Sequence, residues 1–213
     1  MELELEREVI DTAAGEYTVR WIYDEDAGQP YDSGFGLVKI GEHHRRFDIT
    51  TDAEHADEVA DTVRYHRKGN AYDGNIWDRE VRSSAAIARW LRLKFGLKGI
   101  VVIDDSFRPS EPTADRGEDF AGLAWAPDDA TDPDAYTRTM LAEWRAWAEG
   151  DTFGWVVTDP SGHELEDGSV WGYYGLDANR QYTRDYAVEV IDADVTARVS
   201  QCNLVGAGIV GLI

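Results

Sequence analysis

The sequence predicts an α+β fold: a mainly antiparallel sheet with three to four helices packed on it. Segments with the two-residue alternation of β-strands come in adjacent pairs, and other stretches have the three-to-four-residue apolar spacing of amphipathic helices. The clearest strand pair spans residues 153–175 and turns at Asp159-Pro160-Ser161-Gly162. With 213 residues, 43% of them apolar, the chain is long enough for one sizeable domain or two smaller ones.

The first half of the chain contains four further expected strand segments. Residues 2–10 alternate glutamate with apolar side chains, and residues 16–24 are β-branched and aromatic, so we expect a hairpin. Residues 35–40 and 44–49 predict a second short pair. Residues 98–104 are apolar almost throughout, which is typical of a strand covered on both faces, and another short strand is expected at 120–126.

Helices are expected at residues 51–67, 79–95 and 132–150. The third has a strong start signal, because Asp132 can cap it and Pro133 occupies the first turn. We expect its Trp144 and Trp147 to pack on the sheet of the hairpin that follows. From residue 177 the four-residue spacing of aromatic side chains predicts a helix, and the alternation that resumes at Val195 predicts a strand from there.

Charge divides the chain unevenly. The net charge is −21, of which residues 1–110 carry −7 and residues 111–213 carry −14. We therefore expect an N-terminal part, 1–110, with hairpins and two helices, and an acidic C-terminal part, 111–213, with a helix, a hairpin and a final helix or strand; one continuous domain is the alternative. Residues 64–98 are an exception, with a net charge of +6.

Several classes of protein are disfavoured by composition. The overall negative charge opposes binding to nucleic acid or an anionic membrane, and no apolar run reaches the ~20 residues of a membrane helix. Cys202 is the single cysteine, so no internal disulfide is expected. No charged and then apolar leader opens the sequence, which favours a cytoplasmic location.

No cofactor is expected. The terminal Gly206–Gly211 segment matches G-x-G-x-x-G, but only two residues follow it, whereas a dinucleotide site needs a helix and an acidic residue about twenty positions later. We expect a small-residue strand or a mobile tail instead. No metal site is predicted from Asp24–Asp26 or from the adjacent His43 and His44, because neither pattern has the ligand spacing of a known site.

Two alternatives assign chemistry to particular residues. Asp104 and Asp105 follow the apolar strand, where metal-dependent phosphotransfer and nuclease sites often begin, and further carboxylates are available nearby. The second alternative is a nucleic-acid-binding module through the basic helix of residues 79–98, whose candidate side chains are Arg82, Arg89 and Arg92. These arginines lie largely outside the apolar stripe of that helix.

Two segments resemble a loose group of uncharacterised proteins from bacteriophages of GC-rich hosts. Residues 19–32 read VRWIYDEDAGQPYD, and residues 143–175 contain a strand, a D-x-x-G-x-E turn and an S-x-W-G motif. In this chain the later motif residues are Asp159, Gly162, Glu164, Ser169, Trp171 and Gly172. The resemblance covers about 45 residues and implies a phage context without implying an activity.

The leading hypothesis is a phage or mobile-element accessory protein that binds a host macromolecule. It rests on the lack of a catalytic motif, the eight tryptophans and ten tyrosines, and the carboxylates of residues 111–213. In its more specific form the protein is an acidic mimic of nucleic acid that inhibits a host protein. The expected contact residues are Asp115, Glu118, Asp119, Asp128 and Asp129.

Overall fold

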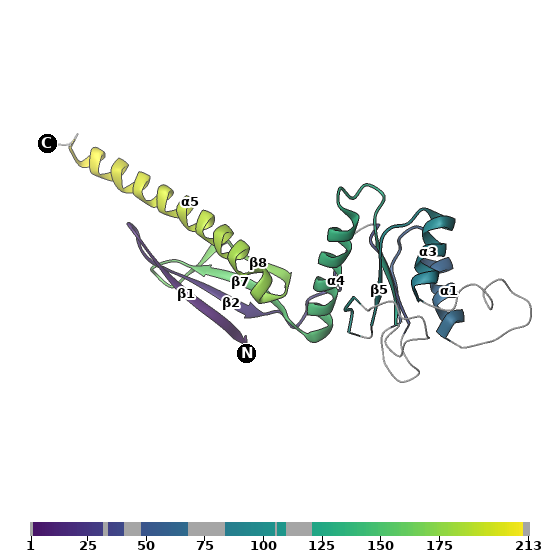
Figure 1. The fold of residues 1–213 in the computed structure, drawn as a ribbon. Helices are drawn as coiled ribbons and strands as arrows, with labels where there is room; N and C mark the ends of the chain where they lie inside the picture. The colour runs from purple at the N-terminus through teal and green to yellow at the C-terminus, as the bar shows by residue number, and fades with distance from the viewer. Residues whose placement is uncertain are drawn as a thin grey trace, which may run out of the picture. The chain divides into compact units, whose positions relative to one another are not determined.

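The computed structural model describes residues 2–31, 34–40, 48–67, 84–104, 106–109 and 121–210. The chain forms two compact units, and several of their elements are labelled in Figure 1. The terminal unit combines residues 1–28 with residues 149–213, and the central unit spans residues 29–148. Each contains a four-stranded antiparallel sheet with at least one helix against it, which confirms the α+β class.

This division differs from the expected boundary at residue 110. Strand β2, Gly15–Tyr23, pairs antiparallel with β7, Thr152–Thr158, so the first and last parts of the chain share one sheet. The central unit is therefore an insertion between these two paired strands. Periodicity along a sequence identifies strands but not their distant partners, which is why the charge boundary did not coincide with the structural one.

The terminal sheet has the order β1-β2-β7-β8, with β1 at Glu4–Thr12 and β8 at Glu164–Tyr174. Both expected hairpins, β1–β2 and β7–β8, are confirmed. The Asp159 carboxylate holds the β7–β8 turn, because its Oδ1 accepts hydrogen bonds from the backbone N–H of Ser161 at 2.8 Å and of His163 at 2.9 Å. Gly162 adopts the left-handed conformation that this turn needs, with φ of 81°.

Helix α5, Leu176–Val210, runs along the terminal sheet (Figure 1). The prediction of a strand from Val195 was wrong, and the terminal glycine-containing segment is helical as far as residue 210. The helix continues because Ala187, Ile191 and Val195 keep a four-residue spacing against the sheet. No helix in the described part of the chain has both the length and the apolar character needed to cross a bilayer.

The core of the terminal unit lies between α5 and one face of the sheet. Alternate residues of β2 and β7 point to this face and are fully buried: Tyr17, Val19, Trp21, Phe153, Trp155 and Val157. Ala187 and Ile191 cover them from α5. Tyr182 and Tyr186 lie at the margin of this core, with 64% and 42% of their surfaces exposed and the Tyr186 ring 5.5 Å from that of Trp155.

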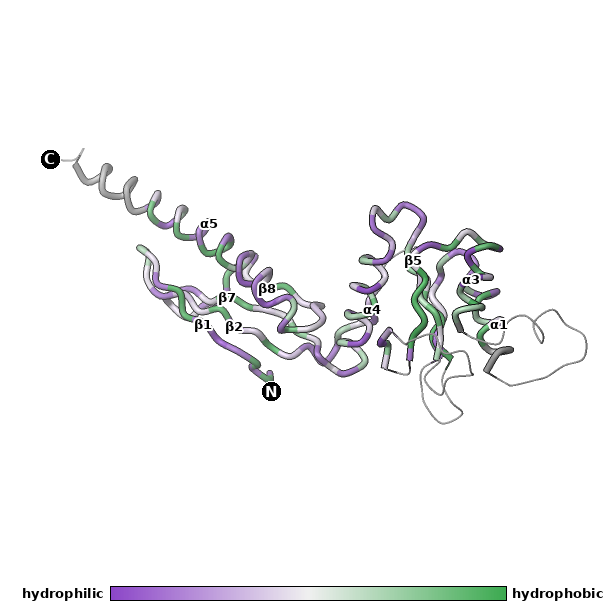
Figure 2. Tube along the Cα trace, viewed as in Figure 1, coloured by the Kyte–Doolittle hydropathy of each residue, from purple (hydrophilic) through white to green (hydrophobic). Residues whose placement is uncertain are grey.

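The central sheet has the order β4-β3-β6-β5 and is antiparallel throughout. Its strands are β3 Gly36–Lys39, β4 Ile49–Thr50, β5 Lys98–Ile103 and β6 Gly122–Ala126. Strand β3 pairs with β4, which overlaps the expected second strand, 44–49, only at Ile49; residues 44–47 lie outside the described residues. Strand β5 is buried from its second residue to its last and is hydrophobic along its course in Figure 2, as expected of a covered strand.

Helices cover both faces of the central sheet. Helices α1, Ala56–Arg67, and α3, Ser84–Phe95, pack on one face, where Val38, Val102 and Trp125 point. Helix α4, Pro133–Glu149, packs on the other, and its N-terminus is capped by Asp132, whose Oδ1 accepts from the Ala135 N–H at 3.1 Å.

Trp144 packs within the central unit and not on the following hairpin. Its ring stacks on Phe107 with centroids 6.0 Å apart, and it shares a cluster with Leu37 and Ala124 of the central sheet. The expectation that Trp144 joins helix 132–150 to the sheet of residues 153–175 was therefore wrong. An amphipathic stripe shows that a helix packs, but it does not say on which sheet.

Candidate functional site

Asp104 is the one residue of the expected metal site that the structure describes. Its Oδ1 accepts hydrogen bonds from the backbone N–H of Ser106 at 2.8 Å and of Arg108 at 2.9 Å, so the carboxylate stabilises the turn after β5. In the described ranges no three histidine, cysteine or acidic side chains lie close enough to hold a metal ion. The other acidic candidates lie outside the described residues: Asp105, Asp115, Glu118 and Asp119.

Asp128 and Asp129 lie in the exposed turn between β6 and α4. Lys98 at the start of β5 reaches this turn, because its Nζ donates to the Asp128 backbone carbonyl at 2.7 Å and lies 3.9 Å from the Asp128 Oδ1. Asp128 is therefore the expected contact residue that belongs to a structured surface feature, a pocket described below.

The basic helix is described from Ser84 onward as α3, and Arg82 lies outside the described residues. Arg89 and Arg92 are exposed on the side away from the central sheet. Leu93 beside them is also exposed, at 78%. The outward orientation expected for these two arginines is confirmed, and what they bind stays a prediction.

The terminal unit concentrates the negative charge of the protein. It contains five arginines, no lysine and 20 acidic residues, a net charge of −15, whereas the central unit carries the remaining −6. Every one of the five arginines contacts a carboxylate of the same unit. The pairs are Arg7–Glu4, Arg20–Glu2, Arg180–Glu6, Arg184–Glu8 and Arg198 with both Asp159 and Asp194.

Two of these pairs join α5 to the edge strand β1. Arg180 donates from Nε to Glu6 Oε2 at 2.6 Å, and one helical turn later Arg184 donates from Nη2 to Glu8 Oε1 at 2.7 Å. The hydrogen bonds from Arg180 lower the pKa of the Glu6 carboxyl below its ordinary value. The spacing explains the match, because residues four apart on a helix and two apart on a strand each lie on one face.

Arg198 forms the third link, between α5 and the β7–β8 turn. Its Nη2 donates to Asp159 Oδ2 and its Nε to Asp194 Oδ2, both at 2.6 Å. Tyr17 of β2 joins the cluster by donating from its hydroxyl to Asp194 Oδ2 at 2.6 Å. Burial, followed by this contact with Asp194, raises the pKa of Tyr17 to about 12.

The outward face of α5 carries carboxylates outside the arginine pairs described above. Asp185, Glu189 and Asp192 are exposed and recur at helical spacing, and within the described part of the chain they form no ion pair. The exposed rings of Tyr182 and Tyr186 lie on the same part of the helix. The sequence showed that the second half of the chain is acidic, but the expected contact residues were those of 115–129 and not those of α5. The sequence alone does not show which carboxylates are paired with arginines.

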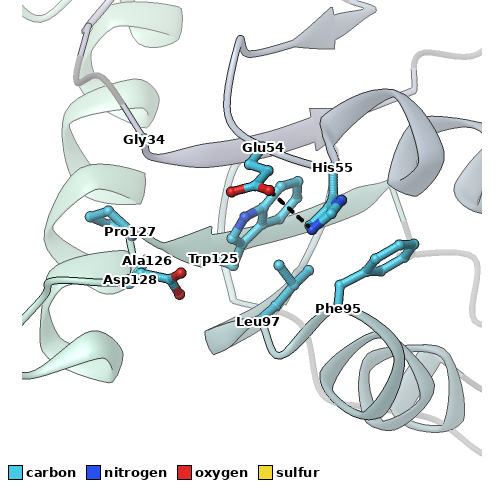
Figure 3. Close-up of a pocket in the computed structure, with 9 residues that line it drawn as sticks. All are labelled: Gly34, Glu54, His55, Phe95, Leu97, Trp125, Ala126, Pro127 and Asp128. Carbon is cyan, nitrogen blue, oxygen red and sulfur yellow. Dashed lines mark ion pairs between the residues drawn. The ribbon is translucent and has the colours of Figure 1, made fainter.

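A pocket of about 150 Å³ lies in the central unit, between the start of α1, the end of α3 and the β6–α4 turn (Figure 3). Aromatic and apolar side chains line the pocket together with two carboxylates, those of Glu54 and Asp128. Its lining residues are Gly34, Glu54, His55, Phe95, Leu97, Trp125, Ala126, Pro127 and Asp128. Sequence reasoning missed it, since these residues come from four separate segments.

Rigid contacts hold the pocket's aromatic side chains. The His55 imidazole stacks on the Phe95 ring, with centroids 4.5 Å apart and the planes 27° from parallel. His55 Nε2 lies 3.7 Å from Glu54 Oε1, shown as the dashed line in Figure 3. Trp125, only 3% exposed, lies against Gly36, where an added Cβ would come within 1.8 Å of the indole.

Comparisons with known proteins found no match for this chain. No protein-family model matches it, and no curated protein or solved structure shows significant similarity to it.

Proposed function

We propose that the protein acts by binding a positively charged partner protein through the carboxylate surface of its terminal unit. One observation carries this proposal: all five arginines of that unit are already engaged by its own carboxylates, and the unit still has a net charge of −15. The net negative charge of this unit attracts a basic protein surface over a long range and so speeds association. The arginines of the unit already have carboxylate partners.

The exposed tyrosines of α5 support a binding surface over a merely solvating one. Tyr182 and Tyr186 pack by an edge against Tyr173 and Trp155 and leave 64% and 42% of their surfaces exposed near Asp185 and Glu189. Tyrosine is a residue type enriched where proteins bind one another. The ring can bury against an aliphatic stem of lysine or arginine while the neighbouring carboxylate pairs with its charge. The resemblance to bacteriophage proteins makes a host protein the expected partner.

Mimicry of nucleic acid is the more specific form of the proposal. Asp185, Glu189 and Asp192 provide one negative charge per roughly 5 Å of helix axis at a rise of about 1.5 Å per residue. A DNA strand presents one phosphate per about 3.4 Å of its axis. The row on α5 is therefore sparser than a phosphate backbone, and a mimic needs carboxylates from the neighbouring strands as well.

The test compares two variants that remove the same charge from different places. The α5 variant carries Asp185→Asn, Glu189→Gln and Asp192→Asn; the turn variant carries Glu164→Gln, Glu166→Gln and Asp167→Asn on the exposed start of β8. A partner retained from host lysate at low salt is purified, and its Kd for each variant is measured as salt is raised. We expect the α5 variant to bind at least about ten-fold more weakly and the turn variant nearly normally.

Equal weakening by the two variants contradicts a specific surface and indicates general charge attraction. Failure to retain any partner at low salt contradicts the proposal itself. For the mimic form, double-stranded DNA must compete with the protein for the same partner; a partner that binds both at once excludes mimicry.

A further inference from the structure

We propose that the pocket of the central unit receives a single arginine side chain of the partner. The inference rests on the proposed function in one respect, that the partner is basic. It assigns a separate contact, because the pocket is built wholly from residues of the central unit, whereas the carboxylate surface belongs to the terminal unit.

The size of the pocket selects a side chain over a metabolite. Sites for cofactors and drug-sized ligands usually have volumes of about 300–1,000 Å³. A cavity of about 150 Å³ accepts a group the size of benzene. The pocket's volume of about 150 Å³ therefore suits one side chain inserted from a partner surface.

The chemistry of the lining selects a planar cation. Trp125 forms the buried floor, and the stacked rings of His55 and Phe95 form one wall. Glu54, just before α1, and Asp128, in the β6–α4 turn, contribute the two carboxylates. A guanidinium group stacks on aromatic faces and pairs with carboxylates through its edges, so it satisfies both kinds of lining at once.

The pocket's own cations leave these carboxylates accessible. Lys98 directs its short hydrogen bond to the Asp128 backbone carbonyl, at 2.7 Å, and its Nζ stays 3.9 Å from the carboxylate. The Lys94 ammonium lies 4.6 Å from the Trp90 centroid and 4.4 Å from that of Phe95, so this cation is held by aromatic rings and not by the pocket's carboxylates. The Asp128 side chain is 86% exposed and that of Glu54 is 85% exposed.

The backbone arrangement is consistent with a preformed site. His55 has φ of 66°, in the left-handed region that non-glycine residues rarely occupy, and its carbonyl accepts from the Val59 N–H at 3.0 Å within the first turn of α1. This conformation directs the imidazole onto Phe95 before any ligand arrives. A site whose rings are already ordered loses less conformational entropy on binding.

The experiment uses ethylguanidinium as the probe and neutral ethylurea, of similar shape, as its control. Both are titrated into the full-length protein by NMR, with the Trp125 indole N–H and the backbone amides of Gly34 and Ala126 as reporters. We expect saturable shifts confined to these reporters for ethylguanidinium. Ethylurea is expected to bind at least about five-fold more weakly, because it lacks the charge.

Matched variants test the carboxylates. Glu54→Gln and Asp128→Asn are each expected to weaken the probe about two- to five-fold, the range for an exposed charge pair, while Asp129→Asn removes the same charge beside the pocket and leaves probe binding unchanged. Equal binding of the two probes, shifts spread over the terminal unit, or indifference to both pocket variants overturns the inference.

The partner's affinity separates this inference from the proposed function. If Glu54→Gln and Asp128→Asn weaken the purified partner but Asp129→Asn does not, the arginine site is supported. If only the α5 variant weakens it, the arginine site is overturned and the carboxylate surface stands. If the α5 variant binds normally and the pocket variants do not, the proposed surface fails and the pocket stands.

Discussion

Arg198 of α5 contacts Asp159 at the β7–β8 turn through a 2.6 Å hydrogen bond, and the Arg198 side chain is itself 37% exposed. The Asp159 side chain is only 8% exposed. The backbone N–H of His163, followed by Arg198, lowers the pKa of Asp159 below its ordinary value. One carboxylate therefore serves both the hairpin turn and the attachment of the helix.

Replacing Arg198 with methionine is expected to destabilise the terminal unit, because it leaves the buried Asp159 without its cation. Urea unfolding followed through the amide signals of β2 and β7 measures this change. Arg7→Met is the matched control: its pair with Glu4 is exposed, and a clearly smaller loss of stability is expected. Equal effects of the two variants contradict a special role for Arg198.

Tyr17→Phe is expected to remove part of the pH dependence of stability at alkaline pH. The ordinary pKa of tyrosine is 10.0, and the folded value of Tyr17 is raised to about 12. The unfolded chain thus loses its proton first, so the contribution of Tyr17 is complete below pH 10.0 and is lost as pH rises toward about 12. Free energies of unfolding measured across this window decline less steeply in the variant; parallel curves refute the assignment.

At the acidic end, stability is expected to fall as Glu6 and Asp159 take up protons. Both have folded pKa values below their ordinary 4.5 and 3.8, so their contribution is present above those values and is lost as pH falls through the folded ones. Unfolding curves of the wild type and of Glu6→Gln, measured from neutral pH to below pH 3.8, provide the test. A variant as acid-sensitive as the wild type excludes Glu6 as a contributor.

Gly36→Ala is expected to destabilise the central unit by about 1–3 kcal/mol, because the new methyl group would overlap the buried Trp125 ring. Thermal or urea unfolding of the central unit, followed through the Trp125 indole signal, measures the loss. Gly28→Ala, at the end of the terminal unit's first segment, controls for adding a methyl group in open space: no atom lies within 4 Å of the added Cβ, and stability is expected to change by less than about 0.5 kcal/mol. A neutral Gly36→Ala shows that Trp125 is free to move.

Local signals in the sequence predicted most elements of the fold. The capped start of α4 at Asp132 and Pro133 and the turn at Asp159 are examples, because each depends on residues within a few positions. Alternation also identified β1, β2 and β7 as strands. What it left open was their order, since the pairing of Trp21 with Trp155 joins residues that no local pattern connects.

The candidate sites were less predictable, for two physical reasons. The five arginines of the terminal unit lose their availability through contacts such as Arg180–Glu6, which exist only once α5 lies beside β1. The pocket assembles His55, Phe95 and Trp125 from separate segments, and each residue alone has the appearance of ordinary core or surface. The sequence gives the number of acidic residues, whereas the fold determines which of them are exposed and which pair with arginines.

The pairing of β2 with β7 has a consequence for the order in which the chain folds during synthesis. The β1–β2 hairpin leaves the ribosome first, yet the strand and helix that cover Tyr17, Val19 and Trp21 follow only after about 120 residues of the central unit. The apolar face of this hairpin therefore stays without its covering strand and helix while the central unit is synthesised. The glutamates that alternate along β1 then act as gatekeepers, because a charged edge discourages the waiting hairpin from pairing with another nascent chain.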